Sequence, residues 1–285
     1  MWRLGLAGLA GLLLASLPQV ASAAPTSLAT AGPTYYLALG DSLAKGYQPL
    51  DRGKLASCGF QYGYACDLYT ALLNTHPALQ AVNLSCPGET TTSMLTGVGS
   101  PCFSSGPPQL ARALQFLARH RGHVALITID IGANNVDGCV SSGSVSPTCL
   151  SQGMQAVAMQ LPVILSALRG TAGAAVPIVG MNYYDPFLAA YFVSGGTALA
   201  RESLAVTVAF NSLLGGIYAS AGDPVADVQT AFGTLDGLPT SADFICLWTW
   251  MCSPPTPANI HANEAGYLVI ATAFEQVPVV TTLLA

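Results

Sequence analysis

The sequence predicts one α/β domain built around a largely parallel sheet. Candidate strands and candidate helices alternate along about 260 residues, which is typical of a parallel sheet with crossover helices. Of the 285 residues, 52% are hydrophobic and 8% are charged. A chain of this length and composition can bury a sizeable core and is not dominated by disorder. No internal repeat or linker divides it.

The first half of the chain begins the alternation. Residues 35–39 form a short apolar and aromatic run stopped by a glycine, as expected of a buried strand. Residues 65–73 have a helical pattern, and residues 81–84 are a brief strand candidate. Two prolines open an amphipathic helix at 107–122, which ends in a basic segment and a glycine. The run HVALITIDI at 123–131 is the strongest strand candidate.

The second half continues the pattern. A polar loop is expected at 137–148, and a loop rich in tryptophan and proline is expected at 229–259. The regular elements of this half are a helix at Met154–Leu168, a strand at Val176–Met181, a helix at Leu199–Tyr218, a strand at Val225–Val228 and a helix at Glu264–Phe274.

A short apolar run near the amino terminus has the pattern of a secretory signal peptide. Leu4–Leu17 follows Arg3 and precedes a small-residue string that ends at Ala23. The run is shorter than the roughly 20 residues that a membrane span needs; the alternative is an uncleaved anchor. We expect residues 1–23 to be the signal peptide and residues 24–285 the mature domain, without an integral membrane span. Loss of Arg3 changes the formal net charge from −5 to −6.

All eight cysteines lie in the expected mature chain. An even number of cysteines in an exported protein favours disulfides over reactive thiols. The sequence has no C-x-x-C motif and only four histidines, so it gives little support to a metal site. Proximity along the chain favours the pairs Cys58–Cys66, Cys86–Cys102, Cys139–Cys149 and Cys246–Cys252.

A serine directly follows the first predicted strand, in the run Gly40-Asp41-Ser42-Leu43. Ligands of a parallel α/β sheet bind outside the carboxyl ends of its strands, where this turn would lie. A small residue before the serine would expose the hydroxyl there, with amides of the next helix nearby. The alternative is that Asp41 or Ser42 is an ordinary helix N-cap. No G-x-S-x-G motif surrounds any serine, which counts against a standard α/β-hydrolase elbow.

Three further residues could serve hydrolytic chemistry with such a serine. His261 precedes the last predicted helix and could act as the base, because a serine nucleophile needs one and chain order does not constrain it. The N–H groups of Ser42 and Gly88 and the side-chain amide of Asn134 could stabilise an oxyanion. Taken singly, Gly88 could equally be a turn glycine, and Asn134 a turn or cap residue.

Together these blocks resemble the SGNH (GDSL) hydrolases, a family of serine esterases and lipases. The GDSL block at 40–43, the glycine block at Gly88, the G-x-N block at 132–134 and the histidine block at His261 occur in the family's order. The resemblance implies a flavodoxin-like three-layer α/β/α sandwich. It also implies Ser42 as nucleophile, His261 as general base, and an oxyanion hole of Ser42, Gly88 and Asn134.

The chain departs from the family pattern at two places. Asn135 stands where the G-x-N-D block has an aspartate, and Ala258 stands where the D-x-x-H block has its acid. A histidine without a carboxylate still needs its Nδ1–H oriented. A backbone carbonyl, the Asn259 side chain or a remote acid such as Asp243 could orient it.

We therefore expect a secreted serine esterase or lipase, outside the cell, in the periplasm or at the cell surface, which acts as a monomer on small-molecule or lipid esters without a cofactor. The scattered nine basic residues exclude a nucleic-acid partner. The alternatives are a carbohydrate acetyl esterase and a binding protein on a degenerate hydrolase scaffold. An apolar acyl-binding wall could come from the aromatic loop, or that loop is only packed core; its large residues are Phe244, Leu247, Trp248, Trp250 and Met251.

Overall fold

The computed structural model describes residues 1–2, 34–50, 55–141, 143–253 and 258–285. Contacts divide the chain into a segment of residues 1–32 and a compact unit of residues 33–285. The predicted signal peptide and its cleavage after Ala23 lie outside the described residues. The α/β unit contains the residues that the sequence singles out for chemistry.

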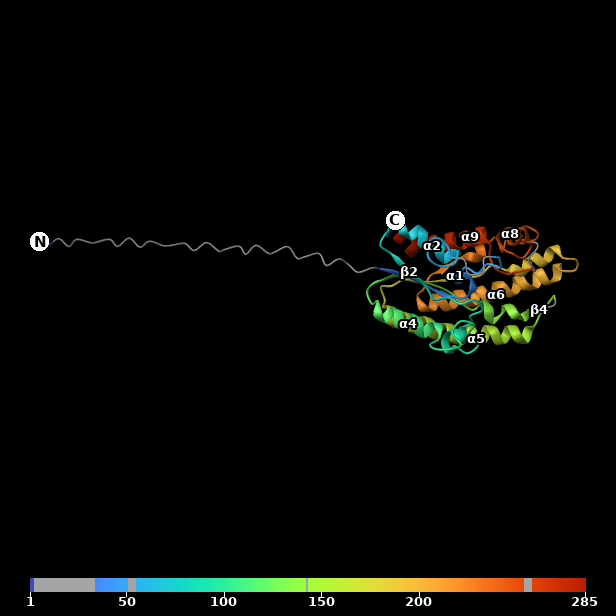
Figure 1. Cartoon of the computed structure of the whole chain (residues 1–285), viewed down its shortest axis with the longest axis horizontal. Helices are drawn as coiled ribbons and strands as arrows, with labels where there is room; N and C mark the ends of the chain where they lie inside the picture. Colours follow the sequence, from blue (N-terminus) through green and yellow to red (C-terminus); the bar gives the residue numbers. More distant parts are fainter. Residues whose placement is uncertain (3–33, 51–54, 142, 254–257) are drawn as a thin grey trace. The chain divides into compact units, whose positions relative to one another are not determined.

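A five-stranded parallel sheet forms the centre of this unit and confirms the predicted fold class (Figure 1). The strand order is β2-β1-β3-β6-β7, so the chain leaves β1 toward one edge and returns to the other side for β3. A ligand site is expected outside the carboxyl ends of β1 and β3, where the order reverses. The strands are β1 (Tyr35–Gly40), β2 (Gln80–Asn83), β3 (Val124–Asp130), β6 (Ile178–Met181) and β7 (Val225–Ala226).

Helices cover both faces of the sheet and complete the three-layer sandwich (Figure 1). On one face, α9 packs against α2, α7 and α8; on the other, α5 packs against α3, α4 and α6. The α-helices are α1 (Ser42–Lys45), α2 (Tyr64–Leu73), α3 (Thr91–Thr96), α4 (Gln109–Arg119), α5 (Pro147–Ala172), α6 (Thr197–Ala221), α7 (Val228–Ala231), α8 (Thr240–Trp248), α9 (Glu264–Glu275) and α10 (Pro278–Leu284).

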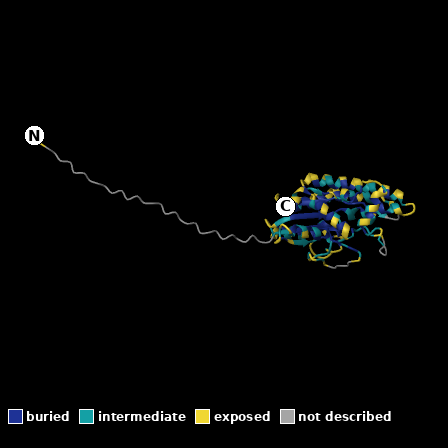
Figure 2. Cartoon of the chain, turned by 90° about the horizontal axis from the view of Figure 1, so that it is seen from above, coloured by how far each residue is buried: buried dark blue, intermediate teal, exposed yellow. Residues whose placement is uncertain are grey.

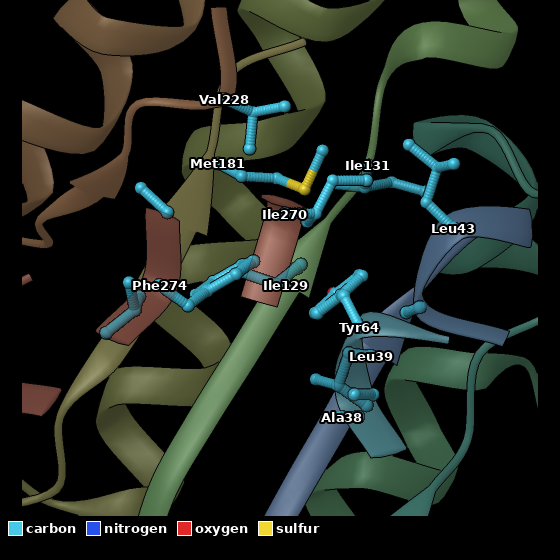
Figure 3. Packing of buried hydrophobic residues seen from close by; sticks show 14 of the residues in the cluster. Ala38, Leu39, Leu43, Tyr64, Ile129, Ile131, Met181, Val228, Ile270 and Phe274 are labelled. Atoms are coloured by element: carbon cyan, nitrogen blue, oxygen red, sulfur yellow. The ribbon is translucent and has the colours of Figure 1, made fainter. Parts of the chain in front are cut away.

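The core lies between the sheet and these two layers, and exposed residues gather on the outer sides of the helices (Figure 2). Figure 3 shows side chains from β1, β3, β6 and α9 meeting at one interface. Tyr64 of α2 stacks on Phe274 of α9 with ring centroids 4.9 Å apart. Full burial of a large apolar side chain contributes about 1.5–3 kcal/mol, so this interface fixes the sheet on which the site is built.

Several parts of the secondary structure differ from the sequence prediction. The expected polar loop at 137–148 contains the short strands β4 (Val140–Ser141) and β5 (Ser144–Val145), and α3 was not predicted. The segment 229–259 is not one loop, because it contains α8, and the chain ends in a helix, α10, that was not predicted. The α8 sequence TSADFICLW is rich in β-branched and aromatic residues, so local propensity gives little helical signal. Packing against α9 and the 3₁₀ helix η3 (Pro186–Phe192) stabilises α8.

By length and composition, the helix α6 could cross a membrane. The same holds for α9 and α10 if the two are counted as one bent span. In this fold α6 is instead part of the domain. It packs against η3 and α5, and it buries Phe210, Leu214 and Tyr218.

The eight cysteines form four disulfides, which are the pairs favoured by proximity along the chain. Each disulfide ties an irregular segment to itself or to a helix, and three of them lie beside the predicted site loops. Those three are Cys86–Cys102 after β2, Cys139–Cys149 between η2 (Asp137–Cys139) and α5, and Cys246–Cys252 at the end of α8. Cross-links of this kind restrict the unfolded chain and limit the movement of the loops.

Candidate active site

Ser42 is the first residue of α1 and follows β1 after one intervening residue. That residue, Asp41, is the N-cap: its carboxylate accepts a hydrogen bond from the Leu43 N–H at 3.0 Å. The capping role therefore falls to Asp41, and the Asp41 carboxyl is also in hydrogen-bond contact with the Ser42 side chain. Ser42 is 7% exposed and lines a cavity at the carboxyl edge of the sheet.

The turn before Ser42 can be made only with glycine at position 40. Gly40 has a φ of +129°, and a Cβ there would lie 2.0 Å from Asp130 Oδ1. Gln109 of α4 binds both backbone polar groups of Gly40. Its side-chain oxygen accepts from the Gly40 N–H at 2.7 Å, and its side-chain amide donates to the Gly40 carbonyl at 2.9 Å. These contacts fix the direction in which β1 delivers the serine.

The buried Asp130 carboxyl supports the turn from below. It accepts hydrogen bonds from the Ala44 N–H and from the Tyr64 hydroxyl, both at 3.0 Å. Burial raises the pKa of Asp130 well above its usual value, and the neighbouring Asp41 charge raises it further. The charged form of Asp130 is therefore disfavoured beneath the nucleophile.

The loop that carries Gly88 lies beside this turn. The Cys86 N–H donates to the Gly40 carbonyl at 3.1 Å and so ties the loop to the end of β1. Gly88 adopts a φ of +79°, a backbone conformation that favours glycine. The next residue, Glu89, is fully buried and accepts a hydrogen bond from the Ser100 hydroxyl at 2.8 Å. Gly88 does not itself line the cavity.

Asn134 and Asn135 lie in the 3₁₀ helix η1 (Ala133–Asn135) that follows β3. Asn134 lines the cavity, and its Nδ2 donates to the Glu89 carbonyl at 3.0 Å, which leaves one N–H of the amide for another acceptor. Asn135 exchanges two 3.0 Å hydrogen bonds with Thr91: its oxygen accepts the Thr91 N–H and its Nδ2 donates to the Thr91 hydroxyl. Because an ionised aspartate could not donate, an amide suits position 135 better here.

His261 lies in the loop before α9 and lines the same cavity as Ser42 and Asn134. The Asn259 side-chain oxygen accepts from the His261 N–H at 3.1 Å and contacts Nδ1 at 2.7 Å. Since an amide oxygen only accepts, Nδ1 carries the ring proton and the lone pair is on Nε2. Of the candidates for orienting the ring, Asn259 is the one whose side chain contacts Nδ1; Asp243 is an exposed residue of the first turn of α8.

Burial lowers the pKa of His261 to about 4, so the ring is neutral near pH 7. The Tyr47 ring lies 4.5 Å from the imidazole between centroids. The loop is held on both sides, because the Trp250 N–H donates to the His261 carbonyl at 3.0 Å and the Tyr184 hydroxyl donates to the Ile260 carbonyl at 2.7 Å. A neutral, oriented imidazole is the protonation state that a general base requires.

The cavity has about 700 Å³ of empty space, part of it open to solvent. Its polar edge holds Ser42, Asn134 and His261. None of the large residues of the aromatic loop lines it, so that loop does not provide an acyl-binding wall; Phe244 stacks on Trp248 instead. The apolar wall comes mainly from the residues on either side of η2, from η3 and from α6. It includes Val136, Val140, Phe187, Val206, Phe210 and Ile260.

A family comparison identifies this arrangement. The model of the GDSL-like lipase/acylhydrolase family matches residues 38–269, which include every block of the site. The chain belongs to this family. Its members are carboxylic ester hydrolases. Comparison with curated protein sequences found no match.

Three solved structures share the fold of this chain at 15–19% identity. An extracellular lipase from Streptomyces rimosus is 19% identical, with 84% of this chain and 99% of the lipase covered and a TM-score of 0.55. Phospholipase A1 from Streptomyces albidoflavus is 18% identical, with 88% and 99% covered and a TM-score of 0.56. The acetylxylan esterase Axe2 from Geobacillus stearothermophilus is 15% identical, with 86% and 94% covered and a TM-score of 0.54.

Some residues that build the site were not predicted from the sequence. Asp130 carries a visible signal, because it is a lone acid inside the apolar strand sequence HVALITIDI. Gln109 gives no such signal, and Asp137, which lines the cavity from η2, reads as an ordinary loop residue. Among the described residues, no group of three or more histidine, cysteine or acidic side chains could hold a metal ion.

Proposed function

We propose that this family member is an active serine esterase in which Ser42 and His261 hydrolyse carboxylic esters through an acyl-enzyme. One observation carries the proposal: Ser42, Asn134 and His261 line one cavity at the carboxyl edge of β1 and β3. They come from separate segments of the chain, and each is held by its own hydrogen bonds. Such convergence is typical of a catalytic site.

In the first half-reaction, Ser42 Oγ attacks the ester carbonyl carbon while His261 Nε2 takes the hydroxyl proton. The carbonyl oxygen becomes an oxyanion, stabilised by the N–H groups of Ser42 and Gly88 and by the free N–H of Asn134. The C–O bond to the alcohol then breaks, and His261 gives its proton to the leaving oxygen. The acyl group remains on Ser42.

In the second half-reaction, His261 deprotonates a water molecule that attacks the acyl-enzyme carbonyl. A second oxyanion forms at the same donors, the bond to Ser42 Oγ breaks, and His261 returns the proton to that oxygen. The carboxylic acid leaves and the enzyme is restored. Each step transfers a proton between His261 and an oxygen, so no metal or organic cofactor is needed.

Asn259 takes the place of the family's acid in this proposal. Its oxygen keeps the Nδ1–H tautomer, so Nε2 can accept the Ser42 proton. It has no charge with which to stabilise the imidazolium, and the pKa of about 4 for His261 is consistent with that. We therefore infer a Ser–His–Asn centre that is weaker in base strength than one with a carboxylate.

The largely apolar wall supports an ester substrate with an apolar acyl chain. The signal-peptide pattern at residues 1–23, the four disulfides and the similarity to an extracellular lipase support a secreted enzyme. Four disulfides would be reduced in a cytosolic compartment, so function outside the cytoplasm fits the covalent structure.

The direct test is hydrolysis of a p-nitrophenyl ester series, from acetate to palmitate, by wild type and Ser42→Ala in parallel. We expect turnover by wild type and loss of turnover in the variant, with unchanged circular dichroism and melting temperature. Equal turnover by both proteins would refute the role of Ser42. The absence of turnover by folded, disulfide-bonded wild type would instead favour the binding protein.

A further inference from the structure

Two polar side chains in the wall of the catalytic cavity have no partner. Asp137 lies at the start of η2 and Thr207 lies in the middle of α6, and both line the cavity. Neither side chain makes a hydrogen bond or an ion pair with any residue that the structure describes. Other polar groups of the wall are engaged: the Ser203 hydroxyl donates to Asp185 at 2.8 Å, and the Tyr184 hydroxyl donates to the Ile260 carbonyl.

Asp137 is only partly buried, so its carboxyl stays open to the cavity and to a ligand that enters it. Asp137 does not cap a helix, and within the described part of the chain no lysine or arginine lines the cavity. The carboxyl lies near Asp41, Asp185 and the Tyr184 hydroxyl, none of which can supply a positive charge. The fold therefore gives this acid no structural role.

Burial raises the pKa of Asp137 to about 8, and the charges of Asp41 and Asp185 add to this effect. Near neutral pH most of the carboxyl is protonated, so it can donate one hydrogen bond and accept another. Thr207 adds a hydroxyl that can also donate or accept. A neutral hydroxyl on a ligand is the partner that satisfies both, since it too donates and accepts.

The lining of the cavity indicates which part of an ester would reach these groups. In the proposed reaction the leaving alcohol lies at His261, which protonates it, and the acyl group lies on the other side of Ser42. Only Ile260 and His261 line the cavity from the histidine loop. The rest of the wall belongs to the first turn after β1, to η1 and η2, to the segment leading into η3, and to α6. Most of the cavity is therefore acyl-binding space.

We propose that Asp137 and Thr207 bind a hydroxyl group on the acyl chain, so that this enzyme selects hydroxyacyl esters over alkyl esters of the same length. This inference rests on the proposed esterase function. The disulfide Cys139–Cys149 ties η2 to α5, which holds Asp137 in the wall and favours a preformed site.

The test compares p-nitrophenyl hexanoate with its 2-, 3- and 6-hydroxy derivatives. A site that binds a hydroxyl discriminates strongly against a substrate that lacks it, because its own polar groups are then left unpaired. We expect kcat/KM of wild type for one hydroxy isomer to exceed that for hexanoate by about tenfold or more. Equal or lower values for all three isomers would overturn the proposal.

Three variants assign the preference to these side chains. Asp137→Leu and Thr207→Val should each lower the ratio of kcat/KM for the hydroxy isomer to kcat/KM for hexanoate to about one. Asp137→Asn keeps a donor and an acceptor and should keep the preference. The exposed Asp243 gives a matched control: Asp243→Leu should leave kcat/KM unchanged for both hexanoate and the hydroxy isomer. A preference that survives both Asp137→Leu and Thr207→Val would refute the site.

Stability and binding supply readouts that do not depend on turnover. Asp137→Leu removes an unpaired acid, so its melting temperature should equal or exceed that of wild type. If wild type hydrolyses no ester, the proposed function fails, and calorimetry with the hydroxyhexanamides and hexanamide then decides the hydroxyl site. Tighter binding of one hydroxyamide, lost in Asp137→Leu, would support the site, and equal affinities would refute it.

Discussion

Replacement of Asn259 tests how the proposed general base is oriented. The Asn259 oxygen accepts from His261 Nδ1 at 2.7 Å and from the His261 N–H at 3.1 Å. Asn259→Ala removes both acceptors. Asn259→Asp keeps both and adds a negative charge beside the ring. The two variants therefore separate loss of orientation from change of charge.

The magnitude follows from the state of His261 in the reaction. The ring is neutral in the free enzyme and becomes an imidazolium as Ser42 attacks. A hydrogen bond to a charged group contributes about 1.5–3 kcal/mol, so Asn259→Ala should lower kcat/KM by about 10- to 150-fold. A carboxylate strengthens the same bond by about 1.4 kcal/mol, so Asn259→Asp should raise kcat/KM by about tenfold.

The assay measures kcat/KM for p-nitrophenyl butyrate between pH 4 and pH 9. The carboxylate in Asn259→Asp favours the imidazolium, so the acid limb of its profile should move to higher pH than in wild type. Asp243→Asn, which changes an exposed acid, should have the wild-type rate and profile. Rates within twofold of wild type for both Asn259 variants would refute the reasoning.

Three other predictions concern the same site. Burial lowers the pKa of His261 to about 4, so the base stays deprotonated at pH values well below the ordinary histidine pKa of 6.5. We therefore expect kcat/KM for p-nitrophenyl butyrate to be nearly constant from pH 7 down to 5.5. A tenfold fall over that range would contradict the prediction. Asn134→Ala should lower kcat by about 10²–10³-fold, because it removes one proposed oxyanion donor. The melting temperature should fall only slightly, through loss of the hydrogen bond to the Glu89 carbonyl. A fall in kcat of less than threefold would exclude the role as a donor. Gly40→Ala should destabilise the domain by more than about 3 kcal/mol and lower the melting temperature by about 10 °C, since its Cβ would overlap Asp130. A melting temperature equal to that of wild type, measured by calorimetry, would contradict this prediction.

The sequence could predict those parts of the fold and site that depend on local pattern. Buried strands such as Val124–Asp130 are apolar runs, and Ser42 follows such a run directly. Asn259 could be proposed to orient the His261 ring because it lies two residues before His261 in the same loop.

Other parts depend on contacts between distant segments. The supporting roles of Gln109 and Asp130 exist only once α4 and β3 lie against Gly40. The sequence shows Asp130 as a lone acid in an apolar strand but does not indicate its partners, and it gives no signal for Gln109. Asp137 joins the cavity because the fold brings η2 to the same cavity as Ser42, which spacing along the chain does not encode. The helix α8 forms through packing, against weak local propensity.

The proposed oxyanion donors follow the ends of three neighbouring strands, since β1 pairs with β2 on one side and with β3 on the other. Adjacent strands lie about 4.8 Å apart whatever side chains they carry. The spacing of the strands that precede these donors is therefore a property of the backbone. Evolution could replace most of the surface and core without moving the donors, which accords with a shared fold at 15–19% identity. For engineering, acyl preference could be changed on η2 and α6 while the sheet edge is left as it is.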